Sequence, residues 1–292
     1  MKRRCNCDNT KWKNNCRAKN SWVKKEFDEI TKLIGRQPVL SIIQVGDNPA
    51  SSLYIKNKLK KAEELGVVAT LYKFDEDISQ NSLLKKLDVL NEESDGIIVQ
   101  LPLPEHISPK VIMNGIRLEK DVDGLCEKST FNFYNDKFDE LCFTPATAAA
   151  IIDLIKYYKI DLEGKKAAVI GRSYLVGKPT AFLLKKLGAL VSTYNKNTGI
   201  KGVESADLLV TAAGQPDLVK KENIKDGAWL IDAGTTMIER DGMKCFVGDA
   251  SLSPEEYEQL EGYTPTPGGI GPLTVIWLFK NLAKAIRYEF QI

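Results

Sequence analysis

Tyr54 and Lys58 are spaced as a helix would place two side chains on one face. They are four residues apart in a run that reads as helical. Such a pair is usually solvated. A lysine that is partly buried, however, has a lowered pKa and can work as a base near neutral pH. Gln100 follows an apolar run, at the carboxyl end of a predicted strand, where open α/β sheets bind ligands.

The supply of other catalytic bases is small. His106 is the one histidine of the chain, it lies between prolines, and no Gly-x-Ser-x-Gly motif accompanies it. We interpret His106 as a polar loop residue. If the chain is an enzyme, its base is a lysine, a tyrosine or a carboxylate. The polar turn Lys120-Asp-Val-Asp-Gly124 offers two carboxylates, but without further ligands these do not predict a metal site.

A segment rich in proline and glycine, residues 263–274, predicts a shaped loop. Proline fixes φ and removes a hydrogen-bond donor, whereas glycine allows positive φ and close approach of another molecule. An apolar run from Leu273 to Ile286 predicts a helix directly after it. A rigid loop that ends at a helix N-terminus suits a planar or anionic ligand, although a plain turn is the alternative.

The stretch from Val169 to Pro179 joins an apolar strand to a helix, as in dinucleotide-binding folds. The generic Gly-x-Gly-x-x-Gly pattern is not met, because Ser173 replaces the middle glycine and Gly177 comes one residue late. The next strand ends near Lys196, with no acidic residue to bind ribose hydroxyls. Together with Arg172, Lys196 predicts NADP rather than NAD; the alternative is that Lys196 is a solvated loop charge.

Alternating strands and helices must position these residues. The pattern predicts two α/β units and parallel sheets covered on both faces. The first unit has expected strands at 39–45, 67–74 and 96–101 and helices at 50–65 and 80–93. A bridging helix is expected at 146–158. The second unit has expected strands at 165–171, 189–193, 207–213 and 228–233, with a helix at 178–187.

Length and composition favour two domains of a globular protein. The chain has 292 residues, 43% of them hydrophobic, and a net charge of +2. Residues 1–25 carry nine Lys or Arg against Asp8 alone, so the remainder is mildly acidic and offers no basic face for nucleic acid. Residues 1–25 do not read as an amphipathic helix. We expect residues 1–20 to be basic and mobile, and a nucleic-acid tether is a weak alternative for them.

The expected location is the cytoplasm. No run of 18 apolar residues predicts a membrane span, and no apolar segment follows the basic start as in a secretory signal. Six scattered cysteines are typical of reduced thiols. Cys5, Cys7 and Cys16 lack a local fourth ligand for zinc, so no metal is expected.

Six motifs in order resemble the bifunctional methylenetetrahydrofolate dehydrogenase/cyclohydrolase (FolD) family over about residues 38–286. They begin with Val45-Gly-Asp-Asn-Pro-Ala-Ser51, Tyr54-x-x-x-Lys58 and Asp95-Gly-Ile-Ile-Val-Gln-Leu-Pro-Leu-Pro104. They continue with Lys120-Asp-Val-Asp-Gly124, Gly171-Arg-Ser-x-x-Val-Gly-x-Pro179 and Pro267-Gly-Gly-Ile-Gly-Pro-Leu-Thr274. The resemblance implies oxidation of 5,10-methylenetetrahydrofolate with NADP⁺, then hydrolysis of the methenyl product to 10-formyltetrahydrofolate. It also implies a homodimer.

The resemblance also implies a role for each matching residue. Lys58 would be the catalytic lysine, assisted by Gln100, with Tyr54 stacked on the folate rings and Asp123 bonded to the pterin edge. We expect Lys58 to titrate low and to activate water. The wider folate site would include Val99, Leu101, Pro267, Gly268, Gly269, Ile270 and Gly271. The NADP site would include Gly171, Arg172, Ser173, Val176, Gly177, Pro179, Lys196, Gly214 and Thr235.

The expected architecture is two α/β domains with a cleft between them. The folate-binding catalytic domain would comprise 1–142 with 274–292, and a Rossmann-like NADP-binding domain would comprise 143–273. The chain departs from the family pattern at Cys142-Phe-Thr-Pro-Ala-Thr147, at Ser129-Thr-Phe-Asn-Phe133 and at Lys196. Two other functions stay open: an NADP-dependent dehydrogenase of another small substrate, such as a shikimate or amino-acid dehydrogenase, and a folate- or nucleotide-binding protein without catalysis.

Overall fold

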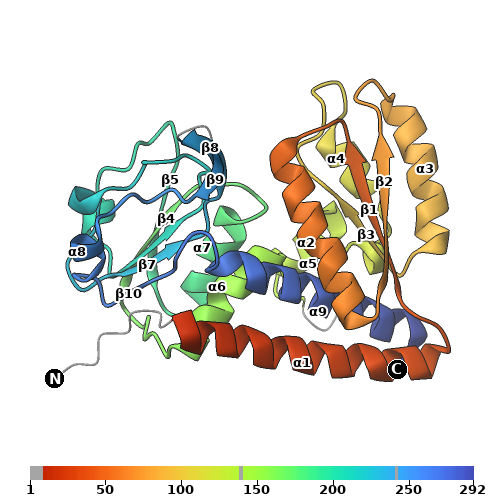
Figure 1. The fold of residues 1–292 in the computed structure, drawn as a ribbon, viewed down its shortest axis with the longest axis horizontal. Coiled ribbons are helices and arrows are strands. Elements are labelled where there is room, and N and C mark those ends of the chain that lie inside the picture. The colour runs from red at the N-terminus through yellow and green to blue at the C-terminus, as the bar shows by residue number, and fades with distance from the viewer. Residues whose placement is uncertain (1–8, 138–140, 241–242) are drawn as a thin grey trace. The chain divides into compact units, whose positions relative to one another are not determined.

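The chain divides into two compact units. A computed structural model describes residues 9–137, 141–240 and 243–292 (Figure 1). The three-strand unit consists of Arg17–Ala146 and Val275–Ile292, and the five-strand unit consists of Met1–Cys16 and Thr147–Thr274. One unit contains a parallel sheet of three strands and the other a parallel sheet of five. In both units strands alternate with helices, as the sequence predicts.

The sheet of the three-strand unit has the parallel order β2-β1-β3. Central β1 is buried along almost its whole length, which its apolar sequence explains, and Leu83, Leu87 and Leu90 of α3 join its core. The strands are β1 (Val39–Val45), β2 (Val68–Phe74) and β3 (Gly96–Val99), and the predicted helices are α2 (Pro49–Leu65) and α3 (Gln80–Glu93). Three further short helices follow β3: α4 (Pro109–Asn114), η1 (Leu118–Lys120) and α5 (Glu127–Tyr134).

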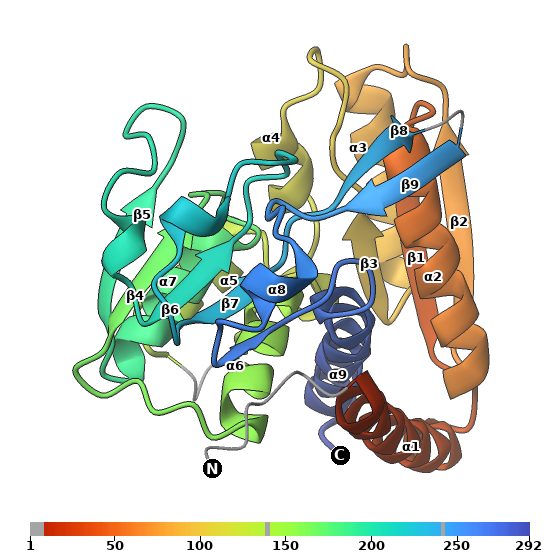
Figure 2. The same cartoon turned by 60° about the vertical axis from the view of Figure 1, so that its left-hand side comes forward.

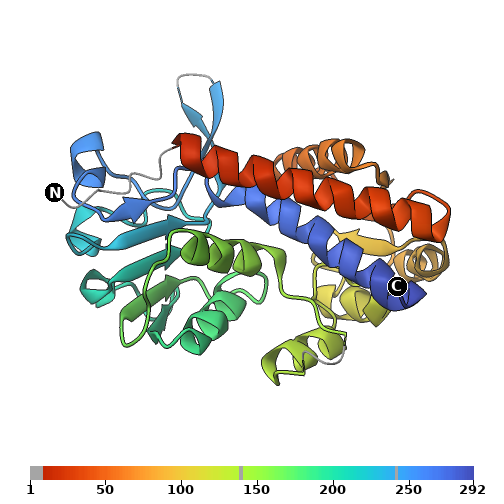
Figure 3. The ribbon, with the colours of Figure 1, turned by 90° about the horizontal axis from the view of Figure 1, so that it is seen from below.

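The expectation that residues 1–25 form no amphipathic helix is wrong for residues 9–25, which belong to α1 (Asn9–Ile34). Val23, Phe27 and Ile30 recur at helical spacing and are fully buried. Phe27 contacts Phe279 of α9 (Ile270–Phe290) edge to face, at 6.2 Å between ring centroids, and the two helices run side by side (Figure 3). Because Lys and Arg dominate this segment, its narrow apolar stripe did not predict a helix. Tertiary packing of the stripe stabilises the helix. Residues 1–8 lie outside the described residues.

The sheet of the five-strand unit has the parallel order β10-β7-β6-β4-β5, and α7 packs on β4 and β5 (Figure 2). The strands are β4 (Lys166–Ile170), β5 (Leu190–Tyr194), β6 (Leu208–Thr211), β7 (Trp229–Asp232) and β10 (Gly262–Tyr263). The helices are α6 (Ala146–Tyr157), α7 (Gly177–Lys186), η2 (Val203–Ser205), η3 (Lys221–Asn223) and α8 (Pro254–Tyr257). The antiparallel hairpin β8 (Thr236–Arg240) and β9 (Met243–Val247) is an addition that the sequence did not reveal.

The proline- and glycine-rich segment is shorter as a loop than expected. Tyr263 ends β10, and α9 begins at Ile270, so Ile270 and Gly271 are helical. Pro272 lies in the first turn of α9, where a proline costs little because the first N–H groups of a helix have no intrahelical acceptor. The irregular part is therefore residues 264–269.

Candidate functional site

Lys58 and Gln100 meet within the three-strand unit. The Nζ of Lys58, on α2, donates to Oε1 of Gln100 at 3.2 Å. The amide of Gln100 donates in turn to the carbonyl of Leu101 at 2.9 Å, which turns its oxygen toward the lysine. Tyr54 lies one turn before Lys58 on α2 and is partly buried. The i,i+4 pair and the strand-end amide therefore belong to one local arrangement.

The start of α2 is fixed to the chain segment that follows β3. Asn48 accepts a hydrogen bond from the backbone N–H of Ser51 at 3.2 Å, as a helix N-cap does, and Pro49 occupies the first helical position. The hydroxyl of Ser51 donates to the carbonyl of Leu101 at 3.2 Å. This bond connects α2 to the residue beside Gln100, so helix and strand end present Lys58 and Gln100 together.

The turn that carries Asp123 runs beside β3. Asp121 forms a parallel bridge with Ile97 of that strand, which brings the turn alongside the strand that leads to Gln100. Both carboxylate oxygens of Asp121 accept backbone hydrogen bonds, from Leu125 at 3.0 Å and from Cys126 at 2.9 Å. Gly124 has a φ of +72°, which favours glycine at the sharpest point of the turn.

The local electrostatics favour neutral forms of the ionisable groups. Burial lowers the pKa of Lys58, and the negative charge of Asp123 partly opposes this shift. Burial raises the pKa of Asp123, and the positive charge of Lys58 partly opposes that. Each group therefore feels the charge of the other, and both side chains are partly buried. A lysine with a lowered pKa can be a proton acceptor at neutral pH.

The turn after β4 in the five-strand unit is built on two obligatory glycines. Gly171 has a φ of +107°, and a Cβ there would lie 2.3 Å from the carbonyl oxygen of Ala212. A Cβ on Gly177, the first residue of α7, would lie 2.0 Å from the carbonyl oxygen of Gly171. Ser173 Oγ accepts from the N–H of Val176 at 3.2 Å, which shapes the turn, and Pro179 is buried in α7.

Arg172 and Lys196 stand near the end of β5. Arg172 donates to the hydroxyl of Thr193 at 2.9 Å and to its carbonyl at 2.5 Å. Lys196 is exposed in the turn that follows, where Asn195 accepts backbone bonds from Asn197 and Thr198. The structure thus brings two cationic side chains to the strand end at which dinucleotide-binding folds bind the ribose.

Two buried carboxylates organise the neighbouring loops. Asp249 accepts from the N–H groups of Ala213 and Gln215, at 2.7 and 2.8 Å, and so holds the turn at Gly214. Asp232 accepts from the N–H of Gly234 at 3.0 Å, next to Thr235. Burial raises the pKa of both carboxyls. Sequence reasoning missed Asp249, which has no local motif and acts through backbone contacts.

The loop at residues 264–269 is fixed to the same strand end. Thr264 Oγ1 accepts from the N–H of Asp232 at 2.8 Å, and Thr266 donates to its carbonyl at 3.4 Å. Gly269 is packed so closely that a Cβ would lie 2.5 Å from the carbonyl oxygen of Pro265. Pro267, Gly268 and Gly271 are exposed, whereas Ile270 is buried.

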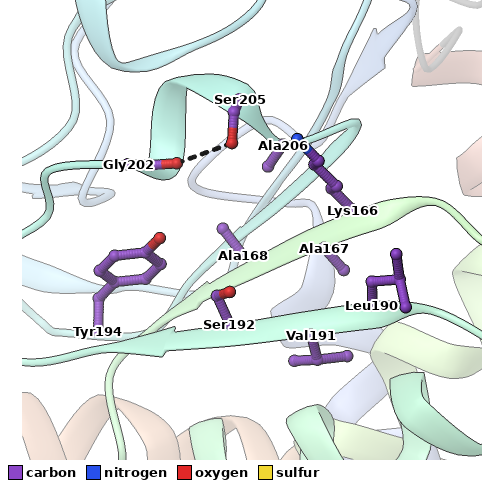
Figure 4. A pocket seen from close by; sticks show the side chains of 10 residues that line it. All are labelled: Lys166, Ala167, Ala168, Leu190, Val191, Ser192, Tyr194, Gly202, Ser205 and Ala206. Atoms are coloured by element: carbon purple, nitrogen blue, oxygen red, sulfur yellow. Dashed lines mark hydrogen bonds between the residues drawn. The ribbon is translucent and has the colours of Figure 1, made fainter.

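The cofactor candidates surround a topological switch point. The neighbouring strands β4 and β6 are followed by connections that lead toward opposite edges of the sheet, from β4 to β5 and from β6 to β7. Dinucleotide-type ligands bind at such a point. Gly171 follows β4 and Gly214 follows β6. A separate pocket of about 470 Å³ lies between β4, β5 and η2 (Figure 4). Tyr194 and Ser192 line this pocket, but none of the predicted cofactor-binding residues does.

Over residues 9–137, 141–240 and 243–292, no group of three or more His, Cys, Asp or Glu is arranged to hold a metal ion. Cys5 and Cys7 fall outside these ranges. No helix in the described part of the chain is long and apolar enough to cross a membrane.

Comparison with protein families matches both halves of the chain. Residues 11–123 match the model "Tetrahydrofolate dehydrogenase/cyclohydrolase, catalytic domain", and residues 145–290 match the model of the NAD(P)-binding domain of the same enzymes. The chain belongs to the tetrahydrofolate dehydrogenase/cyclohydrolase family. Membership confirms the resemblance read from the six motifs, including a Rossmann-like NAD(P)-binding domain.

Individual relatives cover nearly the whole chain. "Bifunctional protein FolD" of Mycoplasmopsis synoviae is 47% identical over 266 residues, which are 91% of this chain and 94% of the relative. The structure of FolD from Trypanosoma brucei, complexed with NADP cofactor and inhibitor, aligns with a TM-score of 0.89 at 30% identity, covering 96% and 97% of the two chains. FolD from Campylobacter jejuni aligns with a TM-score of 0.85 at 35% identity, covering 94% and 97%.

Proposed function

We propose that this member of the family oxidises 5,10-methylenetetrahydrofolate with NADP⁺ and hydrolyses the methenyl product to 10-formyltetrahydrofolate, with Lys58 as the catalytic lysine. Family membership supports both activities. One observation supports the assignment of Lys58 most strongly: its Nζ contacts Gln100 at 3.2 Å while burial lowers its pKa. Tyr54 would stack on the folate rings, and Asp123 would accept hydrogen bonds from the pterin edge.

The oxidation needs a site that tolerates a developing positive charge. Loss of hydride from the methylene carbon leaves a methenyl cation on the folate, so a fixed cation against that carbon would oppose the reaction. A lysine whose pKa is lowered is neutral in a larger fraction of molecules than an exposed lysine. Asp123 beside it adds negative charge when ionised. The pair therefore lowers the electrostatic cost of forming the cation.

The hydrolysis needs a proton acceptor. Water adds to the methenyl carbon, one C–N bond of the ring breaks, and the proton released from water must be taken up. Neutral Lys58 can accept it through its lone pair, while the amide of Gln100, held by Leu101, orients lysine and water. Val99 and Leu101 would line the folate site on either side of Gln100.

The five-strand unit has residues that fit NADP. A Cβ at Gly171 or Gly177 would collide with a backbone carbonyl oxygen, so the two glycines allow a tight turn at the start of α7, where a pyrophosphate would bind. Ser173, Val176, Gly214 and Thr235 would contact the dinucleotide beside this turn, and Arg172 with Lys196 would bind a 2′-phosphate. When bound, NADP⁺ supplies the acceptor for the hydride. Pro267, Gly268, Gly269, Ile270 and Gly271 would contribute the remaining folate contacts.

Lys58→Met tests the catalytic assignment. The variant keeps the length of the side chain but removes the base, so cyclohydrolase activity should fall by at least about 100-fold. NADP⁺ affinity should be unchanged, because the binding turn lies in the five-strand unit. Absorbance of the methenyl form and of NADPH, followed together in the presence of methylenetetrahydrofolate, measures both steps. Lys60→Met, an exposed lysine on the same helix, is the matched control. Normal hydrolysis by Lys58→Met would refute the assignment.

Lys196→Glu tests the cofactor assignment. A charge-assisted contact to a 2′-phosphate is worth roughly 1.5–3 kcal/mol, so its loss should shift the ratio of kcat/KM for NADP⁺ over NAD⁺ by at least about tenfold toward NAD⁺. Lys201→Glu makes the same charge change at an exposed site of the same unit and should leave the ratio as it was. An unchanged ratio in Lys196→Glu would mean that this lysine is a solvated loop charge.

Three further assignments belong to this proposal. We assign 1–142 with 274–292 to the folate-binding domain and 143–273 to the NADP-binding domain. Limited proteolysis with and without NADP⁺ locates the boundaries.

The protein would act as a homodimer, and light scattering measures its oligomeric state. It would act in the cytoplasm, where fractionation of the source cells should recover it. The likeness to the family supports the domain bounds and the homodimer, and the composition of the chain supports the location.

A further inference from the structure

Helix α9 holds the backbone just before Asp123 through one side chain. Asn281 is only 5% exposed, and its Nδ2 donates to two carbonyls, those of Val122 and Thr144, both at 2.9 Å. Val122 is the chain neighbour of Asp123. A buried carbonyl that loses its donor costs more than the bond contributed, so these two bonds strongly favour one position of the turn.

The segment 142–144 behind the turn is also held by α9. Lys284 donates to the carbonyl of Cys142 at 2.6 Å. Gly124 packs so closely on this segment that a Cβ would lie 2.9 Å from the carbonyl oxygen of Phe143. At the start of the turn, Lys120 forms an ion pair with Glu289. Helix α9 therefore supports both the turn and the segment against which it rests, and Asn281 connects the two directly.

We propose that Asn281 is a positioning residue that holds Asp123 in place for the folate. The inference rests on the folate-binding role proposed for Asp123. A carboxylate that recognises the edge of a flat ring by hydrogen bonds must be placed accurately, because such bonds weaken steeply with angle. Asn281 does this from outside the site, through the backbone at Val122.

The chain offers a matched control in Asn91. This asparagine of α3 is 4% exposed and also makes two backbone hydrogen bonds, to the carbonyl of Gly115 at 2.8 Å and from the N–H of Arg117 at 3.0 Å. Its partners precede Asp123 by six residues or more. Asn91→Leu and Asn281→Leu thus remove equivalent side chains, and a general loss of stability affects both.

The experiment measures KM and kcat for methylenetetrahydrofolate, with thermal unfolding and NADP⁺ affinity as parallel readings. Asn281→Leu should raise the KM about tenfold or more, because two hydrogen bonds that place the turn are lost. Asn281→Ser, which keeps one donor, should give a smaller rise in KM. This variant tests the inference where the leucine variant folds poorly. Asn91→Leu should keep the normal KM, and all three variants should keep their NADP⁺ affinity. An equal rise in KM for both leucine variants, or none for Asn281→Leu, would overturn the inference.

An Asp123→Asn variant separates this inference from the proposal beneath it. If its KM is normal, the proposed role of Asp123 fails. If its KM rises while that of Asn281→Leu does not, the inference about Asn281 fails alone. Adding Asn281→Leu to Asp123→Asn should raise the KM little further, because both act on one contact. Independent, multiplied effects would show that Asn281 does not act through Asp123.

Discussion

Asp121 is a buried carboxyl two residues before the proposed folate ligand. Burial raises its pKa to about 7, although backbone hydrogen bonds from Leu125 and Cys126 oppose the shift. In the unfolded chain the group has an ordinary pKa near 3.8. Between these values the folded protein binds one proton that the unfolded chain has lost. The free energy of unfolding therefore decreases as the pH rises through this window.

Asp121→Asn should remove that pH dependence. Relative to the wild type, the variant should gain unfolding free energy from pH 4 to pH 7, by at most about 1.4 kcal/mol for each pH unit. The lost acceptor oxygen lowers stability at every pH and does not change this slope. Urea unfolding of both proteins at several pH values measures the difference. Parallel curves would contradict a raised pKa for Asp121.

At the scale of elements, α1 is stabilised by packing against α9, although its local sequence does not predict an amphipathic helix. Val23, Phe27 and Ile30 are three buried residues in a stretch that otherwise consists mostly of basic and polar residues, so average polarity concealed the helix. The strands of both sheets other than β10 were predictable because they are short, largely apolar runs between clear turn signals. Strand β10, Gly262–Tyr263, is only two residues long and falls where the sequence predicted the start of a loop. The hairpin of β8 and β9 has partly exposed strands and lacks such a pattern.

Phe27→Ala should destabilise the three-strand unit by about 3–5 kcal/mol, because it opens a cavity where Phe27 meets Phe279. Leu33→Ala, on the same helix but 56% exposed, should cost less than about 1 kcal/mol. Chemical denaturation of the two variants tests the comparison. Similar losses from both would mean that α1 does not contribute to the core through the stripe at Phe27.

At the scale of the whole molecule, motifs located the candidate residues, but only the fold shows what supports them. Tyr54, Lys58 and Gln100 could be named from sequence because spacing and strand ends are local properties. Asn281 and Asp249 could not, since each acts on backbone atoms far away in the chain. Hydrogen bonds to a distant carbonyl or N–H group leave no periodicity and need no particular neighbours. Sequence patterns therefore reveal the residues of a site more readily than those that hold it.

The division of the three-strand unit into Arg17–Ala146 and Val275–Ile292 affects the order of events during synthesis. The ribosome completes residues 147–274 before it reaches Asn281, Lys284 and Glu289. A nascent chain that ends before residue 275 contains the whole of the five-strand sheet but lacks the part of α9 that holds the Asp123 turn. Translation thus completes the five-strand unit before the turn that carries Asp123 gains the support of α9.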